Sequence, residues 1–190
     1  MSRRRGITET ALLVATLLSG ASADTQAGTN EAQVKAAFVY NFLKFVAWPE
    51  GTFKRPNDAL VVAMVGDGPT AEATERLLAH KQVGERPLVL RHLKWDEPLT
   101  GVHAVLVNER DAKKLRRILE ETASGGILSI GEGAEFATRG GVIALLVEER
   151  MVRFDIDTDA AVAARLKVSS KLLALTRIVR SSRNHAGDRP

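Results

Sequence analysis

The sequence predicts an α/β fold: one layered domain with a mainly parallel sheet, helices on both faces and an antiparallel hairpin near its C-terminal end. Short apolar runs alternate along the chain with segments of helical periodicity, which is the order expected of such a domain. The run over residues 59–65 is apolar throughout, as in a strand covered on both faces. Residues 152–156 alternate between apolar and charged side chains, as in a strand with one wet face.

Chain length and composition fit one domain of this kind. The chain has 190 residues, of which 45% are hydrophobic and 26% charged, and domains commonly run about 100–200 residues. No internal repeat, low-complexity tract or linker divides the sequence. One domain is therefore expected behind the leader described next.

Residues 1–23 have the features of a secretory signal peptide. Three arginines at positions 3–5 precede an apolar run at residues 11–18, and Ala21-Ser22-Ala23 offers the small residues that a signal peptidase accepts. A membrane anchor is the alternative, but a span needs about 20 apolar residues, and this run is shorter. We therefore expect cleavage before Asp24, which leaves an exported domain over residues 24–190 that does not span a membrane. The arginines leave both the general and the twin-arginine export routes open.

Charge and cysteine content exclude several classes of function. Removal of the leader takes away three arginines and Glu9, so the formal net charge falls from +4 to +2. That charge is too small to favour nucleic-acid binding. The sequence has no cysteine, which excludes disulfides, cysteine catalysis and thiolate metal sites.

The first helix expected in the mature domain is apolar on nearly all sides. Asn30 and Gln33 fit a capping box that predicts a start at Glu31, and Pro49 predicts an end near Trp48. A helix of this kind is either buried on several sides or held by a partner.

The later elements follow from periodicity and turn signals. Strands are expected at residues 59–65, 86–93, 102–107, 126–130, 142–147 and 152–156. Helices are expected at residues 69–80, 111–122 and 159–180, the last with a buried stripe of Ala164, Val168, Leu172, Leu175 and Val179.

Motifs for catalysis and metal binding are incomplete. Asp155, Asp157 and Asp159 fall on the first three ligand positions of a calcium loop, but Ala160 and Leu166 stand where that loop needs Gly and Glu. This departure favours a strand followed by a helix N-cap. The four histidines show no metal-ligand spacing. We therefore predict no catalytic residue, no metal and no cofactor.

Gly66-Asp67-Gly68 follows a buried strand and precedes a helix, where α/β proteins often cradle phosphate. The segment lacks both the G-x-G-x-x-G pattern and the Walker lysine. A tight turn is the favoured interpretation, and phosphate binding here is the basis of an alternative function.

Two blocks of the sequence carry a recognisable pattern. The first is VKAAFVYNFLKFVAWP at residues 34–49, and the second is VRFDIDTDAAVAARLKVSSKLLAL at residues 152–175, preceded by Gly140-Gly141. Both resemble the YfiR-like family of exported bacterial proteins, and the order of elements between them also fits. The resemblance covers about residues 31–180.

The resemblance implies a periplasmic, non-enzymatic regulator. Such a protein binds the periplasmic part of an inner-membrane diguanylate cyclase and so lowers the synthesis of cyclic di-GMP. An outer-membrane lipoprotein relieves the repression, and the regulator is a homodimer. Redox-controlled disulfides matter in the best-known member of the family, but this chain has no cysteine, so that route of control is excluded here.

Partner-binding residues are expected on the first helix and at its end, because aromatic side chains are favoured interface anchors. Phe38 and Phe45 are expected in the core instead. The candidates for partner binding are Tyr40, Phe42, Lys44 and Trp48.

Ligand-binding candidates come from the closing block, where Arg153, Ser170 and Lys171 match positions of the family's motif. An anionic ligand is one explanation of Lys44 and Lys171, and salt bridges or solvated helix ends are the favoured one.

Two other functions are compatible with the sequence. The first is a periplasmic protein that binds or hydrolyses a nucleotide or phosphate ester on the same sheet. The second is a domain that solubilises a neighbour in a larger envelope complex.

Overall fold

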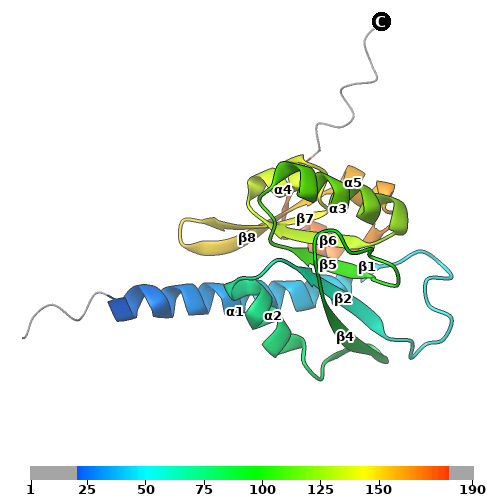
Figure 1. Cartoon of the computed structure of the whole chain (residues 1–190), viewed down its shortest axis with the longest axis horizontal. Helices are drawn as coiled ribbons and strands as arrows, with labels where there is room; N and C mark the ends of the chain where they lie inside the picture. Colours follow the sequence, from blue (N-terminus) through cyan, green and yellow to red (C-terminus); the bar gives the residue numbers. More distant parts are fainter. Residues whose placement is uncertain (1–20, 180–190) are drawn as a thin grey trace, which may run out of the picture.

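An eight-stranded sheet forms the centre of the molecule (Figure 1). The computed structural model describes residues 21–179. The strands are β1 (Val46–Ala47), β2 (Leu60–Val65), β3 (Gln82–Val83), β4 (Arg86–Leu93), β5 (Ala104–Val107), β6 (Leu128–Glu132), β7 (Ile143–Glu148), β8 (Met151–Asp157), β9 (Lys167–Val168) and β10 (Arg177–Val179).

The sheet is mainly parallel. In spatial order the strands are β10-β8-β7-β6-β5-β2-β4-β3, and those from β7 to β4 all run in the same direction. The strand β8 is antiparallel to β7 and parallel to β10, and β3 is antiparallel to β4. Strands β1 and β9 form a separate antiparallel pair. The predicted fold class is therefore confirmed.

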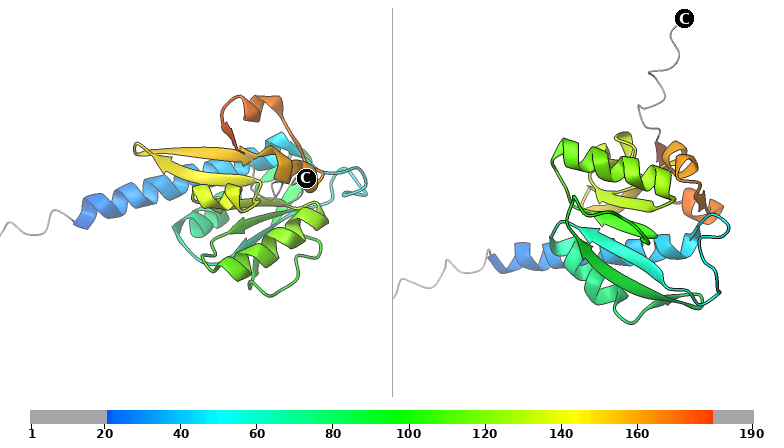
Figure 2. Two further views of the ribbon diagram at one scale, coloured as in Figure 1. Left: turned by 90° about the horizontal axis from the view of Figure 1, so that it is seen from above. Right: turned by 45° about the vertical axis from the view of Figure 1, so that its right-hand side comes forward.

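Helices cover both faces of the sheet, and Figure 2 shows α1 and α3 on opposite sides of it. Alternate residues of β2 enter two different cores: Val62 and Met64 pack with α1 and α2, whereas Ala63 and Val65 pack with α3 and α4. This burial on both faces explains why β2 is an unbroken apolar run. The helices are α1 (Ala21–Phe45), α2 (Pro69–Leu78), α3 (Ala112–Gly125), α4 (Ala134–Thr138), α5 (Thr158–Ala163) and α6 (Ser170–Leu173).

The predicted signal peptide lies for the most part outside the described residues, which include only its last three positions. Within residues 21–179, no helix combines the length and the hydrophobicity that a bilayer span requires.

The opening helix differs from the prediction at both ends. It begins at Ala21 instead of Glu31, and it ends at Phe45 because Val46 and Ala47 leave the helix to pair with β9. Its burial is also more one-sided than expected: Val34 and Phe45 remain 38% and 37% exposed. The expectation that Phe45 belongs to the core is therefore wrong.

The single helix predicted at residues 159–180 is wrong. The chain there forms α5, β9, α6 and β10 in succession. Arg165 takes a left-handed conformation with φ of 56°, and the Leu166 amide donates to the Ala161 carbonyl, which closes α5 with a Schellman motif. The Ser169 side chain then accepts from the Lys171 amide and starts α6. Local capping bonds thus outweigh the helical periodicity.

The residues predicted to form the buried stripe of that helix therefore lie on different elements and differ in exposure. Ala164 and Leu172 are buried, whereas Leu175 is 75% exposed. Val168 pairs with Val46 in the separate two-stranded sheet of β1 and β9, and Val179 lies in the edge strand β10.

The predicted hairpin is present, and its strands extend further towards the turn than the expected ranges 142–147 and 152–156. Glu148 pairs with Met151, so that Glu149 and Arg150 alone form the turn, with φ of 50° and 64°. Positive φ at both central residues is the type I′ geometry that matches the twist of paired strands.

The face of β8 that was expected to be exposed to solvent is buried at two of its three charged residues. Asp155 and Asp157 are 4% and 0% exposed, whereas Arg153 is exposed. Asp157 caps α5, because one of its carboxylate oxygens accepts from the amides of Asp159 and Ala160. The N-cap interpretation of this acidic run is therefore confirmed.

Candidate functional site

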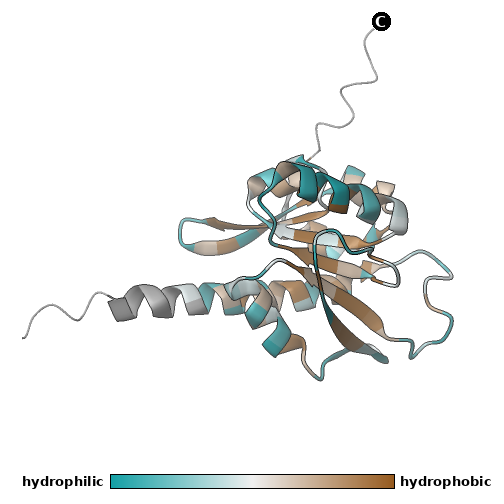
Figure 3. Ribbon diagram, viewed as in Figure 1, coloured by the Kyte–Doolittle hydropathy of each residue, from teal (hydrophilic) through white to brown (hydrophobic). Residues whose placement is uncertain are grey.

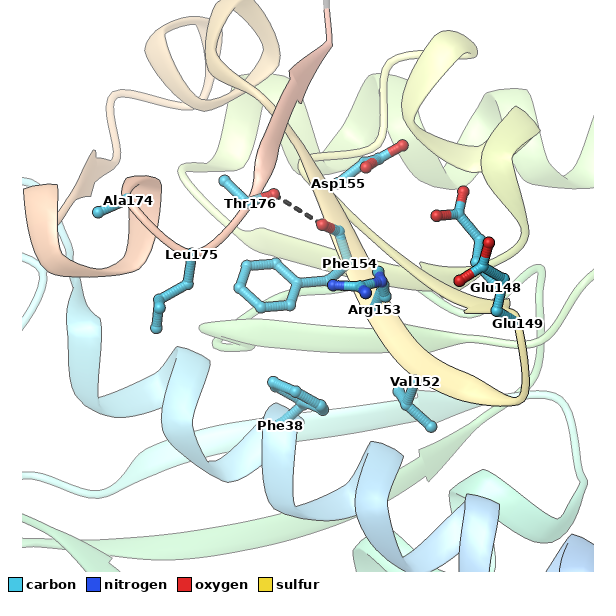
Figure 4. A pocket seen from close by; sticks show the side chains of 10 residues that line it. All are labelled: Phe38, Glu148, Glu149, Val152, Arg153, Phe154, Asp155, Ala174, Leu175 and Thr176. Atoms are coloured by element: carbon cyan, nitrogen blue, oxygen red, sulfur yellow. Dashed lines mark hydrogen bonds between the residues drawn. The ribbon is translucent and has the colours of Figure 1, made fainter.

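A groove of about 960 Å³ opens between α1, the β7–β8 hairpin and the turn that joins α6 to β10 (Figure 4). We call it the hairpin groove. Three segments far apart in the sequence line it, and their side chains are Phe38, Glu148, Glu149, Val152, Arg153, Phe154, Asp155, Ala174, Leu175 and Thr176.

The floor of the hairpin groove is aromatic. The rings of Phe38 and Phe154 have centroids 5.3 Å apart, and each also packs on Phe42, at 6.0 and 5.0 Å. Phe42 and Phe154 are buried and Phe38 is half-buried. Because buried neighbours hold the one accessible ring, the floor is preorganised for an apolar contact.

The rim of the groove carries one strongly exposed apolar side chain. Leu175 is 75% exposed on the α6–β10 turn. The turn is held in place by Thr176, whose hydroxyl donates to the Phe154 carbonyl at 2.7 Å. Val147 and Met151, near the tip of the hairpin and outside the lining of the groove, are 47% and 48% exposed. An exposed leucine above a concave aromatic floor is apolar surface of the kind that a partner covers.

One edge of β8 also faces this region. The register with β10 begins at the pair Arg177–Asp155, so among residues 21–179 the stretch 151–154 of β8 pairs with no strand other than β7, although the Phe154 carbonyl already accepts the Thr176 hydroxyl. The rest of such a strand edge can form backbone hydrogen bonds with an extended partner segment.

The charges at the groove are mixed, with an acidic excess. The lining includes three carboxylates, Glu148, Glu149 and Asp155, and one cation, Arg153. No group of three metal-ligating side chains suitable for an ion occurs here or elsewhere in the described part of the chain. The groove is thus suited to polypeptide contacts, with apolar groups at its floor and ionic groups at its margin.

A second hollow lies at the carboxyl ends of β2, β5 and β6, where the strand order changes direction between β2 and β5. We call it the switch crevice. It consists of two cavities of about 340 and 430 Å³ that share Glu109. Parallel sheets commonly bind small ligands at such a point, and the predicted phosphate segment Gly66-Asp67-Gly68 is located here.

Backbone and side-chain groups of the protein itself fill the glycine turn of the switch crevice. A Cβ on Gly66 or on Gly68 would clash with Asn108, and the Asn108 side-chain amide donates to the Asp67 carbonyl. The glycines are therefore explained by the close approach of Asn108, in agreement with the tight-turn interpretation.

Three of the carboxylates that line the switch crevice are paired: Glu135 with Arg139, which also lines it, and Glu132 and Glu109 with lysines outside the lining. Lys35, on α1, contacts Glu132 and Glu31 at 2.6 Å each, and Glu109 pairs with Lys114 at 3.7 Å. Burial opposes ionisation of Lys35, but its hydrogen bonds and its proximity to the two glutamates outweigh that effect and raise its pKa. The carboxylates Asp67, Glu97, Glu109, Glu132 and Glu135 outnumber the cations Lys94, Arg110 and Arg139 along the crevice.

The four predicted partner-binding residues do not form one surface. Phe42 is fully buried beneath the hairpin groove. Tyr40 donates its hydroxyl to the Gln82 carbonyl at 2.9 Å, and Lys44 lies over the Tyr40 ring. Trp48 donates its indole N–H to the His103 carbonyl at 2.8 Å. The partly exposed members thus hold the first helix and its end against neighbouring strands.

The three predicted ligand-binding residues are also separated. Arg153 lines the hairpin groove, whereas Ser170 and Lys171 lie exposed at the start of α6 and are not part of its lining. Sequence reasoning missed Leu175 and the hairpin tip, because the predicted helix assigned Leu175 to the core.

Comparison with known proteins agrees with this architecture. A search of curated proteins finds no match. The family model described as YfiR/HmsC-like matches residues 32–177, a range that includes the opening helix from Ala32 onward and every segment that lines the hairpin groove. Because that match covers most of the chain, the protein belongs to the YfiR/HmsC-like family.

Proposed function

We propose that the protein is a periplasmic regulator that binds the periplasmic part of an inner-membrane diguanylate cyclase and lowers cyclic di-GMP synthesis, with the hairpin groove as its binding surface. The YfiR/HmsC-like family is periplasmic and regulatory, and it acts on diguanylate cyclases. The observation that carries the choice of surface is the aromatic floor of Phe38 and Phe154 beneath the exposed Leu175.

The protein would act by binding alone. Its apolar groove suits a polypeptide, and the family is regulatory rather than catalytic. Relief of repression by an outer-membrane lipoprotein and assembly as a homodimer complete the proposal. Control through disulfides has no place in it, because the sequence has no cysteine.

Export is part of the same proposal. Residues 1–23 would direct the chain across the inner membrane and be removed after Ala23. The mass of the protein recovered from the periplasm tests this step: a chain that begins at Asp24 is expected. Recovery of the uncleaved chain from the cytosol would contradict it.

The central experiment compares two matched variants. Leu175→Asp places a charge on the rim of the hairpin groove, whereas Val162→Asp places the same charge on α5 at a side chain with nearly equal exposure, 75% against 73%. We expect Leu175→Asp to weaken binding to the periplasmic domain of the cyclase by about tenfold or more, as loss of an interface anchor does. Val162→Asp should bind as the wild type does.

The same variants are then compared in cells that express the cyclase. Deletion of the gene should raise cyclic di-GMP, complementation with Val162→Asp should lower it again, and Leu175→Asp should fail to do so. An unchanged nucleotide level on deletion would overturn the proposed function. Full repression by Leu175→Asp would leave the function standing and overturn the choice of surface.

A further inference from the structure

The segment of residues 49–58 connects β1 to β2 and is held to the sheet by a small aromatic cluster. The ring of Phe53 stacks on the imidazole of His103, with centroids 4.6 Å apart and planes inclined by 19°. Trp48 meets Phe53 edge-on at 6.0 Å. His103 comes directly before β5, so it joins this segment to the centre of the sheet.

His103 is bonded in a way that requires a neutral imidazole. The Val61 amide donates to His103 Nδ1 at 3.0 Å, and the His103 amide donates back to the Val61 carbonyl at 2.9 Å. Because Nδ1 accepts a hydrogen bond, it carries no proton, and the ring proton is on Nε2. The carbonyl of His103 accepts the indole N–H of Trp48.

The charged groups around the cluster disfavour a second cation. From β4, the Arg86 guanidinium lies 3.9 Å from the Phe53 ring centroid and donates to the carbonyls of Arg55 and Asp58. Burial, assisted by the charge of Arg86, lowers the pKa of His103. Trp48, directly after β1, and Val61, on β2, are uncharged residues bonded to His103.

The segment itself carries four further charged side chains, Glu50, Lys54, Arg55 and Asp58. Glu50 and Lys54 are exposed. Arg55 pairs with Asp58 at 2.8 Å, and hydrogen bonds from Arg55 and Lys54 hold the pKa of Asp58 below its usual value. Asp58 therefore stays ionised where histidine changes its charge.

We propose that His103 is a pH-sensitive latch: its neutral imidazole holds residues 49–58 against the sheet, and protonation of Nδ1 in acid conditions releases them. A proton on Nδ1 would place two donors, Nδ1–H and the Val61 amide, against each other. It would also add a positive charge beside Arg86. Release would uncover Phe53 and Trp48 next to the end of α1, so an exported protein would present a different surface in an acidic medium.

The sign of the pH effect follows from the direction of the shift. A histidine whose pKa is lower in the folded state binds fewer protons there than in the unfolded chain. The stability that the neutral latch provides is therefore present above the ordinary histidine pKa and is lost as the pH falls towards the lower, folded-state value.

The test is hydrogen exchange of the Val61 amide in the purified protein, corrected for intrinsic exchange, at about pH 7.5 and about pH 5. In the wild type, protection should fall by about fivefold or more in acid, since one net hydrogen bond of about 1 kcal/mol corresponds to that factor. His103→Asn keeps an acceptor near the position of Nδ1 but does not titrate, so its protection should be equal at the two pH values. His92→Asn, on the exposed histidine of β4, should behave as the wild type.

Two results would overturn the proposal. One is equal protection of the wild-type amide at both pH values, and the other is a parallel fall in His103→Asn. If His103→Asn does not fold, the NMR chemical shifts of the imidazole nitrogens of His103 in the wild type test the proposal instead. The latch requires Nδ1 to be unprotonated at neutral pH and protonated in acid, and a proton on Nδ1 at neutral pH would contradict it.

Discussion

The hairpin groove and the switch crevice are both surface hollows, but the side chains that line them differ in exposure and in pairing. In the groove, Leu175 remains 75% exposed over an aromatic floor. At the crevice, some lining polar groups contact other groups of the protein, as Glu132 does with Lys35 of α1 and Asn108 does with Asp67.

The groove thus leaves an apolar side chain exposed to water, whereas several polar groups of the crevice already have partners within the protein. Burial of exposed apolar groups is the main favourable term in association, so the groove gains from a partner. A small anion would gain little at the crevice, where carboxylates predominate and Lys35 is already paired. The position of a hollow in an α/β fold is therefore a weaker guide to function than the chemistry of its lining.

The largest effect should come from the floor of the groove. Phe42→Ala removes a fully buried ring that supports Phe38 and Phe154, and such truncations cost about 3–5 kcal/mol. Phe45→Ala, at a ring that is 37% exposed on the same helix, should cost less than about 1 kcal/mol. Urea unfolding measures both, and equal losses would show that the aromatic floor is not a packed unit.

A smaller effect is expected from the ion pair of the crevice. Lys35→Met should lower the free energy of unfolding at neutral pH by about 1–3 kcal/mol, because the charged hydrogen bonds to Glu132 and Glu31 are lost. Lys44→Met, at an exposed lysine of the same helix, should change it by less than about 0.5 kcal/mol.

The stabilisation that Lys35 provides should change with pH in a defined direction. The pKa of Lys35 is raised in the folded state, so its contribution is present below the ordinary lysine pKa and is lost as the pH rises through the folded-state value. The difference in stability between wild type and Lys35→Met should therefore shrink in alkaline solution. A difference that stays constant would show that Lys35 stabilises through packing alone.

The smallest effect, a null one, is expected for phosphate compounds at the crevice. A ligand that binds the folded state raises Tm, and we expect no rise with nucleotides, phosphate esters or inorganic phosphate. Differential scanning fluorimetry measures this. A saturable rise that is abolished by Asn108→Ala would restore the alternative of a small-ligand protein and break the contrast between the two hollows.

Much of the fold could be predicted because its signals are local and repeat along the chain. The apolar run of β2, the amphipathic pattern of α3 and the alternation in β8 each contain enough residues to indicate an element type. The helix predicted at residues 159–180 failed for the opposite reason. A left-handed residue at Arg165 and a capping serine at Ser169 are single-residue events that periodicity over a long window does not register.

The candidate site was less predictable than the fold. Arg153, predicted from its motif to bind a ligand, lines the groove, but Leu175 was assigned to the core, and Phe42 was assigned to a partner although it is fully buried. Periodicity tells which side chains share a face of an element. Whether another part of the chain covers such a face depends on contacts between segments that are far apart in the sequence. Phe38 and Phe154, more than a hundred residues apart, make one of these contacts.

Composition and local pattern sufficed for the α/β class, the absence of cysteine chemistry and the family resemblance, because these depend on residue types and short spacings. The assembly of α1, the hairpin and the α6–β10 turn into one groove required the packed chain, since no spacing in the sequence relates Phe38 to Leu175. Long-range packing leaves Leu175 exposed and buries Phe42, and hydrophobicity does not distinguish between these two residues.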